Sequence, residues 1–251
     1  MPPPPATAAV LVIGDEILSG RTQDTNTQAI ARFLGAHGVD LCEVRVVPDV
    51  HGEIVAAVRA LSARYDYLLT TGGIGPTHDD ITADAVAEAT GAPLEEDAEV
   101  VAALAARHGE PPNPARRRMA RFPRGSTRLR HPAGGPPGFQ IGNVFVMAGV
   151  PGIMRGMLED VGPRLRSGAV VLSRTLRVTG SGEGVLAAPL EAVAKAHPAM
   201  SLGSYPFFTP EGFGANLVLR GRDGEELAAA VDELRAALAD AGIAQVEEVA
   251  A

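Results

Sequence analysis

The sequence TTGGIGPTHDDIT at residues 70–82 joins a strand-like segment to a helix-like segment, and it is the most informative stretch of the chain. Residues 65–70 before it form a short, largely apolar run that indicates a buried strand. After it, Ala83, Val86 and Ala87 recur at helical spacing, and Thr82 is placed to cap that helix. The stretch therefore reads as the turn from a strand into a helix.

The same alternation precedes this stretch. Apolar runs at residues 8–13 and 41–47 indicate two further strands, and helical spacing over residues 30–34 and 54–61 indicates the helices that follow them. Such repetition predicts a three-layer α/β domain with a mostly parallel sheet and helices on both faces. Farther along we expect, in order, a helix near residues 100–104, a helix over 113–122, a strand at 144–147 and a helix over 154–158.

The pattern changes near residue 168, where we place a domain boundary. Residues 169–251 show a β-α-β-β-α-β order, which predicts a small α+β domain of the split-βαβ type. Its strands are expected at residues 172–178, 201–208, 216–219 and 244–249, and its helices at 185–196 and 227–238. The main α/β domain then covers residues 8–168, and the proline-rich residues 1–7 are expected to be a disordered tip.

Composition excludes several classes of protein. The 251 residues carry a formal net charge of −8, which disfavours nucleic acid and anionic membranes as partners. Cys42 is the only cysteine, so neither an internal disulfide nor a thiolate zinc cage forms. Lys195 is the only lysine and lies far from any glycine loop, which makes P-loop and Schiff-base chemistry improbable. No segment has the length of a membrane span, so we expect a soluble, cytoplasmic protein.

Three polar loops follow predicted strands at residues 14–22, 48–49 and 70–80. Ligands of open parallel sheets bind at the carboxyl ends of strands, so these loops are the candidate site. In the third loop the glycines allow backbone N–H groups to approach a phosphate, and the helix after it adds its positive end. The loop matches neither the Walker A pattern nor the dinucleotide fingerprint. It can equally be a tight connection between strand and helix.

Carboxylates in these loops suggest a divalent cation. Asp79 and Asp80 are adjacent, and Asp49 follows the neighbouring strand, so Asp49 and Asp80 are the predicted ligands of Mg²⁺, Mn²⁺ or Co²⁺. The alternative is that one aspartate caps the helix and the other is solvated. Asp15 and Glu16 are either further ligands, acid–base groups or solvated side chains.

The segment from Arg107 to Arg130 contains eight arginines and one acid, Glu110. Arginine recognises phosphate through its planar fork of donors, so one or two of these residues are candidates to face a phosphate. The alternative is a solvated face. No aromatic residues are interleaved with the arginines, so nucleic acid binding is not indicated.

Taken together, the loops resemble one family. GDEILSGRT at residues 14–22 with Asn26, VPD at 47–49, TGGIGPTHDDIT at 71–82 and GVP at 149–151 are similar to the molybdopterin-binding domain of the competence/damage-inducible protein A family. The same domain type occurs in molybdenum cofactor biosynthesis proteins and at the front of eukaryotic FAD synthases. The resemblance covers residues 8–165, and residues after 168 resemble the small accessory domain of the FAD-synthase front half.

This resemblance implies a metal-dependent pyrophosphatase acting on a nucleotide diphosphate such as ADP-ribose or FAD, assembled as a dimer or trimer. Alternatives are a non-catalytic module that binds molybdopterin or a nucleotide, and molybdopterin adenylylation. Asp80, Asp79, Glu16 and Asp15 are the predicted catalytic residues. The residues predicted to contact the phosphate-bearing ligand are Gly14, Ser19, Gly20, Asn26, Gly72, Gly73, Gly75, Pro76, Thr77, Gly149 and Pro151.

Overall fold

The computed structural model describes residues 4–132, 136–210 and 212–249. The chain divides into two compact units, residues 1–168 and 169–251. Residues 1–3 of the predicted tip lie outside the described part. At its other end, Ala6 is buried, and the hydroxyl and backbone N–H of Thr7 both donate hydrogen bonds to Asp66. These contacts start the first strand at Thr7, one residue earlier than the apolar pattern indicated.

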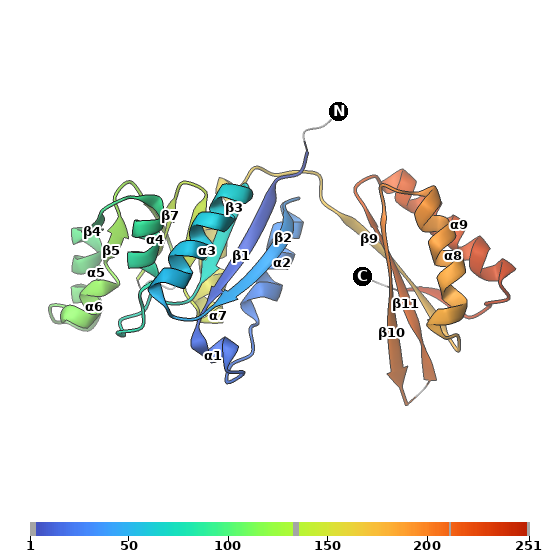
Figure 1. The fold of residues 1–251 in the computed structure, drawn as a ribbon, viewed down its shortest axis with the longest axis horizontal. Coiled ribbons are helices and arrows are strands. Elements are labelled where there is room, and N and C mark those ends of the chain that lie inside the picture. Colours follow the sequence, from blue (N-terminus) through green and yellow to red (C-terminus); the bar gives the residue numbers. More distant parts are fainter. Residues whose placement is uncertain (1–3, 133–135, 211, 250–251) are drawn as a thin grey trace. The chain divides into compact units, whose positions relative to one another are not determined.

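A six-stranded sheet forms the centre of the first unit (Figure 1). Four strands are parallel in the order β2-β1-β3-β8, and β7 and β6 continue the sheet in antiparallel pairing. The strands are β1 (Thr7–Ile13), β2 (Asp40–Val47), β3 (Tyr67–Thr71), β6 (Thr127–Leu129), β7 (Gly138–Ile141) and β8 (Val144–Met147). The predicted, mostly parallel sheet is confirmed.

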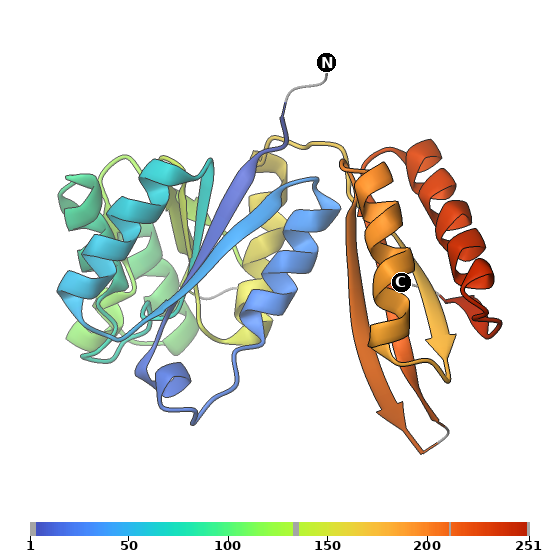
Figure 2. The same cartoon turned by 45° about the vertical axis from the view of Figure 1, so that its right-hand side comes forward.

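Side chains that alternate along β1 build two cores on opposite faces of the sheet. Ala9, Leu11 and Ile13 pack with the apolar residues of α3 (His51–Arg64), α4 (Thr82–Thr90) and α5 (Ala98–His108). Ala8, Val10 and Val12 pack with α2 (Asn26–Ala36) and α7 (Pro151–Val161). Figure 2 shows the helices on both faces, so the predicted three-layer arrangement is confirmed.

Two local predictions in the first unit were wrong. The helix expected over residues 113–122 is a single turn, α6 (Pro114–Arg118), after which β5 (Arg121–Pro123) pairs with β4 (Leu94–Glu96). Phe122 is buried in this strand and packs edge-on against Phe139, which favours the extended conformation over continued helix.

Thr82 does not cap α4, because its hydroxyl donates to the carbonyl oxygen of Gly72 at 3.0 Å. The predicted polar loop after β1 also contains a short helix, α1 (Asp15–Leu18).

The first and last described segments of the first unit both contact the turn at residues 37–40. The backbone N–H of Asp40 donates to Ala6 at 2.8 Å, and that of Gly168 donates to His37 at 3.1 Å. A Cβ on Gly38 would lie 2.2 Å from the carbonyl oxygen of Gly168, so only glycine permits this backbone approach. A short 3₁₀ turn, η1 (Gly162–Arg164), precedes the exit.

The second unit has the predicted β-α-β-β-α-β order. Its sheet is antiparallel with the strand order β10-β11-β9-β12, and apolar residues of both helices pack with those of the sheet. The elements are β9 (Leu172–Thr179), α8 (Glu183–Ala196), β10 (Ser201–Thr209), β11 (Gly212–Gly221), α9 (Gly224–Asp240) and β12 (Val246–Val249). The split-βαβ prediction is therefore confirmed. Among the described residues of the whole chain, no helix combines the length and apolarity that crossing a bilayer requires.

Candidate functional site

The glycine loop, residues 72–81, follows β3 at the carboxyl end of the parallel strands. Gly72 has φ +105° and Gly73 has φ +65°. A Cβ on Gly72 would lie 2.0 Å from the carbonyl oxygen of Ile13, and one on Gly73 would lie 2.2 Å from Oγ1 of Thr82. Both glycines are therefore required where the loop packs against β1 and α4, whether or not a ligand binds.

The carboxylate of Asp80 folds back onto this loop. One oxygen accepts the backbone N–H of Gly75 at 2.7 Å, and the other accepts both the backbone N–H of Thr77, at 2.7 Å, and its hydroxyl. Pro76 between them has no N–H to offer. The chain thus supplies its own anion to N–H groups that were predicted to hold a phosphate, and Asp80 shapes the loop.

Asp49, after β2, lies in a different setting. Its Oδ2 accepts the backbone N–H of Asp15 at 2.9 Å, and its Oδ1 makes no hydrogen bond with the described residues. Burial raises the pKa of Asp49, and the negative charges of Asp15, Glu16 and Asp79 raise it further. The structure therefore brings these carboxylates within electrostatic range of one another.

The two predicted metal ligands are held by different partners, Asp49 by Asp15 and Asp80 by the glycine loop. Within residues 4–132, 136–210 and 212–249, no group of three or more His, Cys, Asp or Glu side chains is arranged to hold a metal ion. Asp49 fits a divalent cation, because it offers a free oxygen in a site with excess negative charge. Asp80 fits that role poorly, since both of its oxygens already accept hydrogen bonds.

Asp79 and His78 point outward at the tip of the glycine loop. The His78 side chain is 96% exposed, and its Nδ1 lies 3.8 Å from Oδ1 of Asp79. Polar neighbours in the loop, first Thr77 and then the backbone N–H of Asp79 itself, hold the pKa of Asp79 below its usual value. Asp79 is therefore an ionised, accessible carboxylate within electrostatic range of the half-buried Asp49.

The loop after β1 has a mainly structural role in this conformation. The backbone N–H of Gly14 donates to Val47, and the Glu16 carboxylate lies over Gly14. Ser19 and Gly20 end α1, since their N–H groups donate to Asp15 and Ile17. Both are exposed and do not line the cavity beside Asn26, and their predicted ligand contacts stay a prediction.

Asn26 is the most informative polar residue of the site. It is 7% exposed, and its Nδ2 donates to the carbonyl oxygen of Gly149 at 2.7 Å, which ties α2 to the start of α7. Its Oδ1 is buried without a hydrogen-bond partner among the described residues. A buried acceptor without a donor costs about 1–3 kcal/mol, so this atom indicates a donor that a ligand or water supplies.

A cavity of about 60 Å³ adjoins Asn26 at the ends of β1 and β3. Five of the predicted site residues line it, namely Glu16, Asn26, Gly72, Gly149 and Pro151. The sequence reasoning missed Thr71 and Asp24, which also line it. Asp24 accepts the backbone N–H groups of Asn26 and Thr27, and this helix-start signal was visible in the order Asp-Thr-Asn-Thr. Thr71 carries no such signal, because it reads as an ordinary end of a strand.

Most arginines of the segment from Arg107 to Arg130 form ion pairs with carboxylates. Its paired members are Arg116 with Glu110, Arg117 with Glu96, Arg121 with Asp84, Arg124 with Glu95, and Arg128 with Asp97 and Glu99. Arg118 instead donates to the carbonyl oxygen of Thr77 at 3.4 Å and, with Gly73 and Asp80, lines a small cavity under the glycine loop. Arg121 lines the same cavity but pairs with Asp84, so Arg118 is the arginine there that has no carboxylate partner among the described residues.

Comparison with known families agrees with the division of the chain. A family model described as a probable molybdopterin binding domain matches residues 9–167. A second model, described as the middle domain of FAD synthase, matches residues 170–247.

Individual relatives give the same picture. A CinA-like protein of Desulfovibrio desulfuricans is 35% identical over 243 residues, which cover 93% of this chain and 56% of that protein. A CinA-like protein of Citrifermentans bemidjiense is 40% identical over 193 residues, which cover 73% of this chain and 47% of that protein. The chain therefore spans about half the length of these relatives.

Among solved structures, the protein CinA with unknown function from Thermoplasma acidophilum is similar at 33% identity and a TM-score of 0.60. The match covers 64% of this chain and 98% of that one. Since the first family model covers more than half of the chain, the protein belongs to the family of probable molybdopterin-binding domains, with a FAD synthase middle domain after it and CinA-like proteins among its relatives.

Proposed function

We propose that this protein is a metal-dependent pyrophosphatase that cleaves a nucleotide diphosphate such as ADP-ribose or FAD. The observation that carries the proposal is the environment of Asp49. This carboxylate is partly buried and lies among the charges of Asp15, Glu16 and Asp79, an arrangement that a bound cation would stabilise. The names of the two matching family models support a phosphorylated, heteroaromatic ligand.

Each residue has a separate task in the proposed reaction. Asp49 and the exposed Asp79 are the carboxylates that would hold a divalent cation. Such a cation would supply positive charge beside the phosphates and would lower the pKa of a water molecule. Glu16 orients the attacking water, and Oδ1 of Asn26 accepts a hydrogen bond from a hydroxyl or amide of the substrate.

Arg118 and Asp80 complete this assignment. Arg118 faces the glycine loop and contacts a phosphate, replacing its long hydrogen bond to Thr77. Asp80 is a positioning residue, because its hydrogen bonds fix the backbone at Gly75 and Thr77 rather than reaching toward a substrate.

The test is release of AMP. The protein is incubated with ADP-ribose or FAD and Mg²⁺, Mn²⁺ or Co²⁺, and AMP is measured by chromatography. We expect Asp49→Asn to abolish release, and Asp232→Asn, which removes an exposed acid of α9, to leave it unchanged. The proposal is wrong if the unaltered protein releases no AMP with either substrate and any of the three metals.

One observation favours a second function, a non-catalytic module that binds molybdopterin or a nucleotide. Asp80 already occupies the N–H groups of Gly75 and Thr77, and the described chain has no preformed cage of three metal ligands. A ligand that raises the melting temperature without being cleaved supports this module. In that case Asp49→Asn retains the thermal shift, whereas Asn26→Leu loses it.

Two expectations about the whole protein remain predictions. We propose a cytoplasmic location and a homo-oligomer, either a dimer or a trimer. Light scattering of the purified protein measures the oligomeric state directly.

A further inference from the structure

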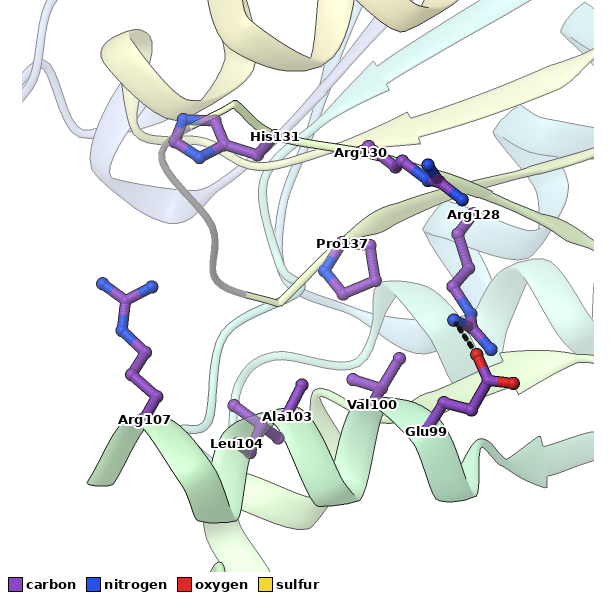
Figure 3. Close-up of a pocket in the computed structure, with 9 residues that line it drawn as sticks. All are labelled: Glu99, Val100, Ala103, Leu104, Arg107, Arg128, Arg130, His131 and Pro137. Carbon is purple, nitrogen blue, oxygen red and sulfur yellow. Dashed lines mark hydrogen bonds and ion pairs between the residues drawn. The ribbon is translucent and has the colours of Figure 1, made fainter. Parts of the chain in front are cut away.

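A third cavity, of about 480 Å³, lies between α5 and the residues Arg130, His131 and Pro137 (Figure 3). Val100, Ala103 and Leu104 of α5 form one wall of this cavity, which we call the α5 pocket. Pro137 forms a second apolar wall. The volume of the α5 pocket falls within the range of small-molecule sites, which is roughly 300–1,000 Å³.

Basic side chains flank this apolar surface. Arg107 extends from the C-terminal end of α5, and Arg130 and His131 lie across from it (Figure 3). The side chains of Arg107 and Arg130 make no ion pair with the described residues, whereas five of the other six arginines of the segment do. The α5 pocket therefore contains two of the segment's guanidinium groups that no carboxylate of the described chain neutralises.

The single carboxylate among the residues that line the α5 pocket lies at the opposite end of α5 from Arg107 (Figure 3). Glu99 accepts a hydrogen bond from Arg128 at 2.9 Å, and its side chain is 82% exposed to solvent. An unpaired guanidinium binds phosphate through two parallel N–H donors, and the apolar wall buries a flat hydrophobic body.

We infer that the α5 pocket is a binding site for an organic phosphate with a flat apolar body. Arg107 and Arg130 lie toward opposite ends of the α5 pocket (Figure 3), so the phosphate contacts one of these two guanidinium groups while the apolar body lies on Val100, Ala103 and Leu104. The pocket uses none of the residues assigned to the proposed pyrophosphatase. It shares Pro137 with the small cavity under the glycine loop, so the two cavities are neighbours.

The probe for this inference is 1-naphthyl phosphate, whose binding is followed by its own fluorescence and by calorimetry. We expect saturable binding that is about tenfold tighter than that of 1-naphthol or of inorganic phosphate alone, because neither compound uses both parts of the pocket. The double variant with Arg107→Ala and Arg130→Ala should weaken binding of 1-naphthyl phosphate at least about tenfold. Arg32→Ala, an exposed arginine of α2, is the control and should change nothing.

A matched pair on one helix tests the location. Ala103→Glu places a carboxylate in the pocket and should abolish binding. Ala102→Glu adds the same charge to the neighbouring exposed position, which does not line the pocket, and should leave the dissociation constant within about twofold.

The result that overturns the inference is equally direct. It is wrong if 1-naphthyl phosphate shows no saturable binding, or if Ala103→Glu and Ala102→Glu bind it alike. Asp49→Asn separates this result from that of the proposed pyrophosphatase, since it should abolish AMP release and leave 1-naphthyl phosphate binding intact.

Discussion

The carboxylate of Asp80 accepts the backbone N–H of Gly75 at 2.7 Å, within the loop that both residues belong to. A second oxygen of the same carboxylate accepts from Thr77. An anion built into the chain therefore holds the glycine loop in shape before any ligand arrives.

Removing that anion should loosen the loop. We expect Asp80→Ala to lower the free energy of unfolding by about 1–3 kcal/mol, because the N–H groups of Gly75 and Thr77 lose their acceptor. Denaturant unfolding and amide hydrogen exchange at Gly75 measure the effect. Asp79→Ala removes an exposed neighbour and should lower the free energy of unfolding much less than Asp80→Ala does. Equal stability of the two variants would show that Asp80 does not hold the loop.

Asp49 should be destabilising when it is ionised. Burial and nearby carboxylates raise its pKa, so its contribution to stability is complete below the ordinary pKa of aspartate and is lost as pH rises through the raised value. Asp49→Asn should therefore raise the melting temperature at pH 7, by roughly 2–4 °C. The gain should vanish near pH 3, where the unaltered side chain is protonated too.

Asp66→Asn should change the melting temperature at pH 7 in the opposite direction and is the control for Asp49→Asn. Hydrogen bonds from the backbone and hydroxyl of Thr7 lower the pKa of Asp66, so its stabilisation is present above the ordinary pKa and is lost as pH falls through the lowered value. Asp66→Asn should lower the melting temperature at pH 7. A shift of the same sign for both variants would contradict this account of Asp49.

Gly72 should tolerate no side chain. Its φ of +105° and the 2.0 Å approach of a Cβ to the Ile13 oxygen predict that Gly72→Ala costs about 3 kcal/mol or more, measured by denaturant unfolding. Gly91→Ala isolates the conformational part of this cost. Gly91 has φ +70°, and a Cβ added there would meet nothing within 4 Å, so its substitution should cost only about 1 kcal/mol. Similar losses for both would show that the approach to Ile13 relaxes easily.

The contribution of Arg164 to stability should depend on the shape of its guanidinium group as well as on its charge. Its guanidinium donates to Thr127, Gln140, the carbonyl oxygen of Arg128 and both the carbonyl oxygen and the carboxylate of Asp160. Arg164→Ala should lower the free energy of unfolding by about 2 kcal/mol, and Arg164→Lys should recover less than half of that, because ammonium cannot reproduce the planar fork. Denaturant unfolding of the two variants measures both losses. Full recovery by lysine would mean that charge alone matters.

The large elements of this fold were predictable because buried strands and amphipathic helices repeat at fixed periods. Residues 8–13 and 144–147 are continuous apolar runs, and both are strands of the central sheet. The strands β4 to β7 escaped prediction, since each has only three or four residues and none of them is a continuous apolar run. The end of α6 was missed because burial of Phe122 against Phe139, a contact between distant residues, decides it.

The site was predictable in its location more than in its chemistry. Parallel strands deliver their following loops to one edge, so Asn26, Gly72 and Gly149 were expected together, and they line one cavity. The partner of Asp80 was not predictable, because the same aspartate can face a cation or turn back to the N–H groups of its own loop. Nor does sequence order reveal which arginines find a carboxylate and which, such as Arg107, do not.

The backbone contacts of Ala6 with Asp40 and of Gly168 with His37 place the two ends of the first unit next to one turn. A domain whose ends are adjacent can be inserted into a surface loop of another protein without separating the two sides of that loop. For the same reason it should tolerate circular permutation, in which a short linker joins the original ends and new ends are made elsewhere. Such portability suits a building block that recurs in chains of different length.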